Sequence, residues 1–243
     1  MTIVRLERVD STQSTIFDLA AQGATDRTVV VADYQAAGRG RRGRAWDAAP
    51  GSSLLTSILV RPRGEPGRWG GYSLVSALSV ADALSRVASL GARLKWPNDV
   101  LVGGRKVAGI LLESRMPAAG APGPAGAGGV IAVGIGINLA QPSFPAGLAA
   151  RATSVLLETG RAVDRDAVLT ALLEAFDGWR TQLEAHGLAP IRRRWLALAD
   201  TIGRRVSVDG ITGVAIDLDV DGALVLQDGE RRHRVVAGEV GVA

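Results

Sequence analysis

Residues 93–113 read Arg-Leu-Lys-Trp-Pro-Asn-Asp-Val-Leu-Val-Gly-Gly-Arg-Lys-Val-Ala-Gly-Ile-Leu-Leu-Glu, three short apolar runs separated by turn residues. The runs predict strands over residues 93–96, 100–102 and 106–113. Pro97-Asn98-Asp99 is typical of a turn, and Gly103-Gly104 is typical of a tight hairpin. We therefore expect a β-meander, with the rest of a sheet built around it.

Further strands and helices are expected on both sides of this meander. The strands are expected at residues 4–9, 28–32, 53–60 (with alternating burial) and 130–139. A helix is expected after the capping residues 10–15 and ends at Gly23, an amphipathic helix is expected at 71–90, and two more at 164–186 and 190–200. This order predicts an α/β (α+β) fold, in which helices flank a mixed β-sheet over residues 1–200.

From Thr201 onward the sequence pattern changes from long helical segments to short β-type runs. Asp-Gly pairs at residues 209–210, 221–222 and 228–229 separate short β-type runs at 205–208, 211–220, 223–227 and 232–236. Residues 201–243 are therefore predicted to form a small β-barrel, too small to be stable without its larger neighbour. Residues 116–129, rich in Ala, Gly and Pro, are predicted to be a loop.

Composition excludes several classes of chemistry. The 243 residues contain no cysteine, which excludes thiolate catalysis. They contain only two histidines, which makes a Ser-His-Asp triad or a histidine zinc site an unfavoured interpretation. The most apolar helical stretch, residues 74–90, is interrupted by Asp82 and Arg86, and the N-terminus does not resemble a signal peptide. We expect a soluble protein of the cytoplasm.

Two residue types are scarce enough to be informative. The chain has a net charge of +4, and its 28 basic residues are 26 arginines and two lysines, Lys95 and Lys106. Asn98 and Asn138 are its two asparagines. A lysine in a chain that otherwise uses arginine indicates a need for a compact point charge, although a surface lysine is the ordinary alternative.

An arginine-rich loop follows the strand predicted at 28–32. Gly38-Arg39-Gly40-Arg41-Arg42-Gly43 matches the Gly-x-Gly-x-x-Gly dinucleotide pattern, but no helix pattern follows and no acidic residue stands about 20 positions later. Its four arginines, with Arg44 the last, repel one another, so we expect the loop to order only around an anion. A solvated basic loop or an RNA-binding tract is an equally good interpretation of this segment alone.

Three other motifs carry polar groups, each with a structural alternative. Lys95-Trp96-Pro97-Asn98-Asp99 presents an amide beside a carboxylate, as a simple turn also does. Gly134-Ile135-Gly136-Ile137-Asn138 places glycines inside an apolar strand, where a ligand approaching the backbone is one good reason for them. Ser11-Thr12-Gln13 is explained by helix capping more often than by binding. Together they resemble parts of a site for an anion and a nucleotide.

These motifs resemble those of the biotin protein ligases in order and spacing. The resemblance rests on Gln-x-x-Gly-Arg-Gly-Arg-Arg-Gly-Arg-x-Trp (35–46), Lys-Trp-Pro-Asn-Asp (95–99), Arg-Lys-Val-Ala-Gly-Ile-Leu (105–111) and Gly-Ile-Gly-Ile-Asn (134–138), and covers nearly the whole chain. It implies an SH3-like C-terminal barrel and a two-step reaction: ATP and biotin give biotinyl-5′-AMP, and biotin then passes to a lysine of a biotin carboxyl carrier domain.

The resemblance also implies roles for individual residues. Biotin would contact Ser11, Thr12, Gln13, Gln35, Arg39, Gly40, Arg41, Lys106 and Gly109. ATP or the adenylate would contact Arg44, Trp46, Lys95, Asn98, Gly136 and Asn138. Arg41, Lys106 and Asp99 would be catalytic, with Asp99 also a candidate Mg²⁺ ligand. Gln13 stands where the family usually has Asn, which makes its contact with biotin less secure.

Three further expectations accompany this interpretation. A lipoate or octanoate ligase on the related fold is the nearest alternative, but it would need a long apolar tunnel. The catalytic pattern starts by Ser11, which leaves no room for an N-terminal helix-turn-helix, so no specific DNA binding is expected. The sequence does not decide the oligomeric state.

Overall fold

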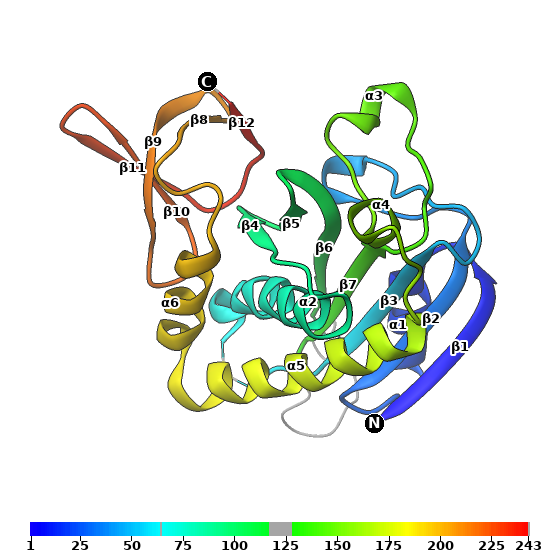
Figure 1. Cartoon of the computed structure of the whole chain (residues 1–243). Coiled ribbons are helices and arrows are strands. Elements are labelled where there is room, and N and C mark those ends of the chain that lie inside the picture. The colour runs from blue at the N-terminus through cyan, green and yellow to red at the C-terminus, as the bar shows by residue number, and fades with distance from the viewer. Residues whose placement is uncertain (64, 117–127, 243) are drawn as a thin grey trace.

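Seven strands form the main sheet, in the order β1-β2-β3-β7-β6-β5-β4 (Figure 1). The structure is a computed structural model that describes residues 1–63, 65–116 and 128–242. The strands are β1 (Thr2–Val9), β2 (Thr28–Gln35), β3 (Ser53–Val60), β4 (Arg93–Lys95), β5 (Asp99–Val102), β6 (Arg105–Arg115) and β7 (Val130–Asn138). β1 and β2 are parallel and the other pairs are antiparallel, which confirms the predicted mixed sheet.

Helices cover both faces of this sheet. α1 (Thr12–Ala21) connects β1 to β2 and packs Ile16 and Phe17 on Val30, Leu59 and Ala132. On the opposite face lie α2 (Gly71–Ala88) and α5 (Arg165–His186), which pack against each other (Figure 1). Short helices α3 (Ala146–Ala149) and α4 (Val155–Thr159) follow β7, and α6 (Leu188–Leu198) leads toward the C-terminal part.

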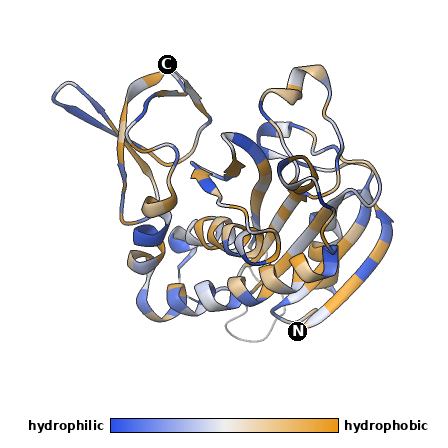
Figure 2. Cartoon of the chain, viewed as in Figure 1, coloured by the Kyte–Doolittle hydropathy of each residue, from blue (hydrophilic) through white to orange (hydrophobic). Residues whose placement is uncertain are grey.

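A second, antiparallel sheet follows α6, in the order β11-β10-β9-β8-β12. Its strands are β8 (Arg205–Val208), β9 (Ile211–Leu218), β10 (Leu224–Asp228), β11 (Arg231–Val235) and β12 (Val240–Val242). Gly210, Gly222 and Gly229 all have positive φ, as expected for glycines in turns, but the third turn is Gly229-Glu230, because Asp228 still belongs to β10 and pairs with Arg231. Figure 2 shows that strands of the main sheet are largely hydrophobic, whereas the tip of the β10–β11 hairpin is hydrophilic.

Two burial patterns differ from the prediction. Every residue of β3 is buried, because α1 covers one face of the sheet and α2 and α5 cover the other. α2 is buried around most of its circumference rather than amphipathic, since it lies between the sheet and α5. Helices α3 and α4 and strand β12 were not expected. The loop predicted at 116–129 lies for the most part outside the described residues.

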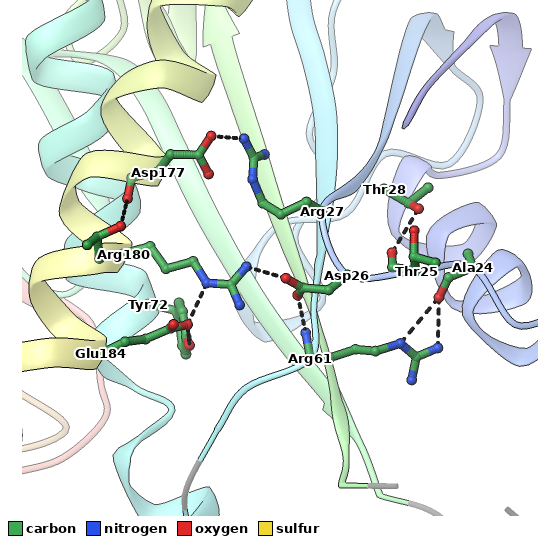
Figure 3. A network of polar contacts seen from close by, with 11 residues as sticks. Ala24, Thr25, Asp26, Arg27, Thr28, Arg61, Tyr72, Asp177, Arg180 and Glu184 are labelled. Carbon is green, nitrogen blue, oxygen red and sulfur yellow. Dashed lines mark hydrogen bonds and ion pairs between the residues drawn. The ribbon is translucent and has the colours of Figure 1, made fainter. Parts of the chain in front are cut away.

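A network of charged residues fixes α5 to the edge of the core (Figure 3). Arg180 is 11% exposed and contacts Asp26 at 2.8 Å and Glu184 at 2.5 Å. The Tyr72 hydroxyl donates to Glu184, and burial, followed by the charge of Glu184, raises the pKa of Tyr72. The network therefore joins α2, α5 and the residues that precede β2.

Replacing Arg180 with methionine is expected to lower the free energy of unfolding by about 2 kcal/mol, because two carboxylates lose a largely buried partner. Arg86→Met is the control, since Arg86 of α2 is 65% exposed where it pairs with Glu174 of α5, and we expect a loss below about 0.5 kcal/mol. Urea titration of both variants measures the difference. Equal losses would show that the buried network adds nothing beyond a surface ion pair.

None of the helices described is long and apolar enough to span a membrane.

Candidate active site

The floor of the site is the face of the main sheet that α1 leaves uncovered at one end. Strand register places Gly109 opposite Gly136, Gly136 opposite Leu55, and Asn138 opposite Ser53. Residues two apart on a strand share a face, so Gly134, Gly136 and Asn138 line the floor in a row. Gly134 and Gly136 therefore share one face of β7, and Gly109 of β6 lies beside Gly136.

Trp46 covers this floor. A Cβ added to Gly136 would lie 2.5 Å from the Trp46 ring, and one added to Gly109 would lie 2.9 Å from it. Any larger side chain at either position would displace the indole. The Trp46 Nε1 atom is buried without a hydrogen-bond partner among the described residues, so a donor is available beside the floor.

Lys106 and Asp99 meet above Gly109. The Lys106 Nζ atom lies 2.6 Å from the Asp99 carboxylate and 5.5 Å from the centre of the Trp46 ring. The backbone of Lys106 is held by Arg151 and Thr153, which bond its N–H and its carbonyl. One of the two lysines is thus a fixed, partly buried cation beside an aromatic ring, and not an unconstrained surface residue.

The start of α1 borders the other end of the floor. Ser11 caps the helix by accepting from the Gln13 N–H, and the Thr12 N–H and hydroxyl both donate to Gln35 Oε1. Gln13 is 3% exposed, and its Nε2 atom donates to the carbonyls of Leu111 and Ala132. Its Oε1 atom is buried with no partner in the part of the chain described, and its side chain lies against Gly134. Capping and site formation therefore coincide at these residues.

The arginine loop is held in place by carboxylates. Arg39 pairs with Glu113 of β6, Arg42 with Asp209, and Arg44 with Glu239. We expected an anionic ligand to be needed to order these arginines; that expectation was wrong in its premise, because protein carboxylates from β6 and the second sheet supply negative charge. The pairing leaves fewer free cations than an RNA-binding tract would offer, although Arg42 and Arg44 remain exposed to solvent.

Two glycines in this loop lie so close to neighbouring backbone atoms that a side chain would be crowded. A Cβ on Gly38 would lie 2.2 Å from the Trp46 carbonyl oxygen, because the Trp46 N–H donates to Gly38 across the loop. In the opposite direction, the Gly40 N–H donates to the Arg44 carbonyl at 2.7 Å. A short 3₁₀ turn at Arg41–Gly43 lies between them, and no longer helix begins at Gly43. The dinucleotide interpretation is therefore excluded.

Arg41 differs from its three neighbours in the loop. Among the residues described, it has no carboxylate at ion-pair distance, and its Nη1 atom donates to Asn98 Oδ1 at 3.3 Å and to the Gly238 carbonyl at 3.2 Å. Burial, then the positive charge of Arg42, lowers the pKa of Arg41. An anion beside it would relieve both effects.

Arg41 also lines a cleft between the two sheets. Lys95, Asn98 and Asp99 contribute from the main sheet, and residues 238–240 contribute from the second. Asn98 is fixed there because its Nδ2 atom donates to the Ile110 carbonyl at 2.8 Å. The motif at 95–99, the arginine loop and the C-terminal sheet thus converge on one cleft.

Asn138 lies at the far end of the floor and is 5% exposed. Its Nδ2 atom donates to the Thr153 carbonyl at 3.0 Å, and its Oδ1 atom accepts from Gln141 Nε2 at 3.2 Å. The Nδ2 atom can donate one more hydrogen bond, and the Oδ1 atom can accept one more.

The predicted site residues therefore form one continuous region, except for two whose positions differ from the prediction. Arg39 lies apart from the cleft because it pairs with Glu113, and Asn138 is enclosed by protein partners. Sequence reasoning missed Ser57, which bonds Thr12, and also Gln141, Asp209 and Glu239. Ser53 and Ser57, two polar residues on the same face of a largely apolar strand, were the available signal for the floor.

Comparison with known proteins identifies the family of this chain. Residues 6–133 match the biotin/lipoate A/B protein ligase family. The biotin–[acetyl-CoA-carboxylase] ligase of Paracoccus denitrificans is 41% identical over 97% of this chain and 98% of its own, and that of Mycobacterium tuberculosis is 35% identical over 97% and 88%. A solved structure, the biotin protein ligase of Aquifex aeolicus in complex with biotin and ATP, superposes with a TM-score of 0.84 at 29% identity, covering 99% of this chain and 97% of that one.

Because the family model matches residues 6–133 and two relatives are 41% and 35% identical over 97% of this chain, the chain belongs to the biotin/lipoate A/B protein ligase family.

Proposed function

We propose that the protein is an ATP-dependent biotin–protein ligase that forms biotinyl-5′-AMP and transfers biotin to a lysine of a biotin carboxyl carrier domain. The observation that carries the proposal is the floor of Gly109 and Gly136 beneath Trp46, with Lys106 and Asp99 beside it. A backbone surface free of side chains, covered by an aromatic ring and flanked by a fixed cation, suits a flat, uncharged ring system with a carboxylate tail. The named relatives are biotin ligases.

In the first step, a biotin carboxylate oxygen attacks the α-phosphorus of ATP, and pyrophosphate leaves. Both reactants are anions, so the barrier falls when cations lie between them. Lys106 is fixed above Gly109 for this role, and Arg41 faces the cleft with no carboxylate of its own among the described residues. Both residues act by binding and by neutralising charge, not as nucleophiles.

In the second step, the acceptor lysine amine attacks the acyl carbon, and AMP leaves. The amine must lose a proton, and Asp99 is the carboxylate nearest to Lys106. We propose Asp99 as the group that accepts this proton or orients the amine. Trp46 and the arginine loop would limit the access of water to the adenylate meanwhile.

Mg²⁺ is expected to accompany ATP. The described residues contain no group of three or more His, Cys, Asp or Glu side chains that could hold a metal by themselves. Mg²⁺ bound with a nucleotide needs only one or two carboxylates besides the phosphates, and Asp99 fits that requirement. Bound there, the ion would screen the phosphate charge.

The remaining contacts of the substrates are proposed from the same arrangement. Ser11, Thr12, Gln13, Gln35, Arg39 and Gly40 would hold biotin at the α1 end of the floor. Arg44, Trp46, Lys95, Asn98, Gly136 and Asn138 would hold ATP. This division follows the order of the two groups along the sheet face, with the α1 group around Ser57 and Gly134 and the other around Gly136 and the cleft.

Residues 1–200 are proposed as the catalytic domain and residues 201–243 as an SH3-like barrel. The second sheet supplies Asp209, Gly238 and Glu239 to the arginine loop. Its apolar residues also belong to the same buried cluster as those of the main sheet. We therefore propose that the barrel braces the loop over the cleft.

The experiment that tests the function uses purified protein, ATP, Mg²⁺ and a carboxyl carrier domain. We expect the carrier to gain the mass of one biotin less one water, only when both biotin and ATP are present. Octanoate and lipoate in place of biotin test the alternative ligase activity, and carrier modified faster by either acid than by biotin would overturn the proposal. A carrier whose acceptor lysine is replaced by arginine is the control.

Only weak, salt-sensitive association with DNA is expected, because the net charge is +4 and three loop arginines are paired with carboxylates. Footprinting at physiological salt, with and without biotin and ATP, measures this. Protection of a discrete operator would contradict it. We further expect the protein to act in the cytoplasm, where ATP and carboxylases are available.

A further inference from the structure

Gln141, in the loop after β7, has a buried acceptor with nothing to accept. Its side chain is 6% exposed, and its Nε2 atom donates to Ser53 Oγ at 2.5 Å and to Asn138 Oδ1 at 3.2 Å. Its Oε1 atom is buried and has no hydrogen-bond partner among the described residues. A buried polar atom left unpaired is costly, which indicates a partner absent from the protein itself.

The orientation of this amide is set by a backbone carbonyl. The Thr153 carbonyl can only accept, so the Asn138 atom beside it must be the donor Nδ2. Asn138 Oδ1 therefore faces Gln141, and the Gln141 atom beside it must be the donor Nε2. A flipped Gln141 would place two acceptors against each other, so Oε1 is the atom left available.

The Gln141 backbone is held as firmly as its side chain. Its carbonyl oxygen accepts from Ser154 Oγ at 2.7 Å, and its Nε2 atom is bonded to Ser53 on β3. Ser53 and Asn138 are opposite each other in the sheet, one position along the floor from Gly136 and Trp46. The Gln141 amide thus lies next to Ser53 and Asn138, at the end of the floor where we place the nucleotide.

We propose that Gln141 selects the base of the nucleotide, its Oε1 atom accepting a hydrogen bond from the exocyclic amine of adenine. This rests on the proposed use of ATP at this site. A base with an oxygen in place of that amine would present an acceptor to an acceptor, and a base with hydrogen there would leave Oε1 unpaired. A site built to bond an N–H rejects analogues that lack it.

Comparison of ATP with purine riboside triphosphate, which lacks only the exocyclic amine, tests the proposal in the full-length protein. Biotin adenylation by the unaltered protein is expected to favour ATP by about 10-fold in kcat/KM. In Gln141→Met, which keeps the length of the side chain but removes its amide, this preference should fall to less than about 2-fold, with the KM for biotin unchanged. Gln141→Leu is a second variant with the same expectation.

Gln182→Met is the matched control, since Gln182 is exposed on α5 and should keep the full preference. Equal use of the two nucleotides by the unaltered protein would overturn the proposal, as would a preference that survives in a folded Gln141 variant. A purely structural role, or a water molecule bound to Oε1, predicts the same loss of rate with both nucleotides. Absence of adenylation with any nucleotide would instead count against the proposed function.

Discussion

Replacing Lys106 with alanine is expected to slow formation of biotinyl-5′-AMP by about 10²- to 10³-fold, on the order of 3–4 kcal/mol. Lys106 is held between Asp99 and the Trp46 ring, and its backbone is bonded on both sides, so its charge is already in place before the substrates react. A charge that meets the junction of carboxylate and phosphate contributes most in the transition state. The affinity for ATP should change much less than the rate.

Single-turnover adenylation, with ATP binding measured separately, distinguishes these effects. Lys106→Arg is the informative companion, because a guanidinium keeps the charge but is planar and larger than an ammonium. We expect it to recover only part of the rate. An alanine variant with unchanged single-turnover adenylation would show that Lys106 is a structural partner of Asp99 and takes no part in the reaction.

Replacing Arg41 with glycine is expected to speed release of the adenylate from the protein by about 10- to 100-fold, the loss of one charge-assisted hydrogen bond to a phosphate. Among the loop arginines, Arg39, Arg42 and Arg44 are paired with carboxylates, so Arg41 is the one poised for an anion. Early release would also label proteins less selectively. The dissociation rate of biotinyl-5′-AMP measures the effect.

Arg42→Gly is the matched control. It removes the same charge from the same loop, and the positive φ of Arg42 suits glycine, but it breaks only the exposed pair with Asp209. We expect its release rate to change less than about 3-fold. Limited trypsin digestion adds a second measure, since cleavage after Arg41, Arg42 or Arg44 should diminish once the adenylate forms. Identical release from both variants, or equal cleavage in both states, would mean that the loop does not retain the adenylate.

Much of the fold could be predicted because local patterns and tertiary structure agree. The strand at Ser53–Val60 has the predicted bounds, and the Gly103-Gly104 turn and the glycines of the Asp-Gly pairs adopt the positive φ values that their sequences indicate. α3, α4 and β12 were missed because they are three to five residues long, and β12 exists through its pairing with β8. Ser154 and Gly160, which cap α4 at its two ends, were the signals available for that helix.

The sequence indicated candidate site residues but not the contacts between them. Rare lysines, rare asparagines and glycines in a strand indicated Lys106, Asn98, Asn138 and Gly136 as site residues. The partners of the arginine loop could not be predicted, because Asp209 and Glu239 lie more than 160 residues away in sequence and meet the loop only through the packing of the second sheet. Trp46 against Gly109 and Gly136 likewise depends on the register of β6 and β7.

The most direct test of the account is to isolate the intermediate. The protein is incubated with labelled biotin and with ATP labelled at the α-phosphate, without carrier, and then separated from small molecules. We predict that biotin and AMP remain bound in equal amounts, that pyrophosphate is released, and that added carrier takes the biotin while AMP is freed. Recovery of ADP and inorganic phosphate, or AMP formation without biotin, would contradict the account.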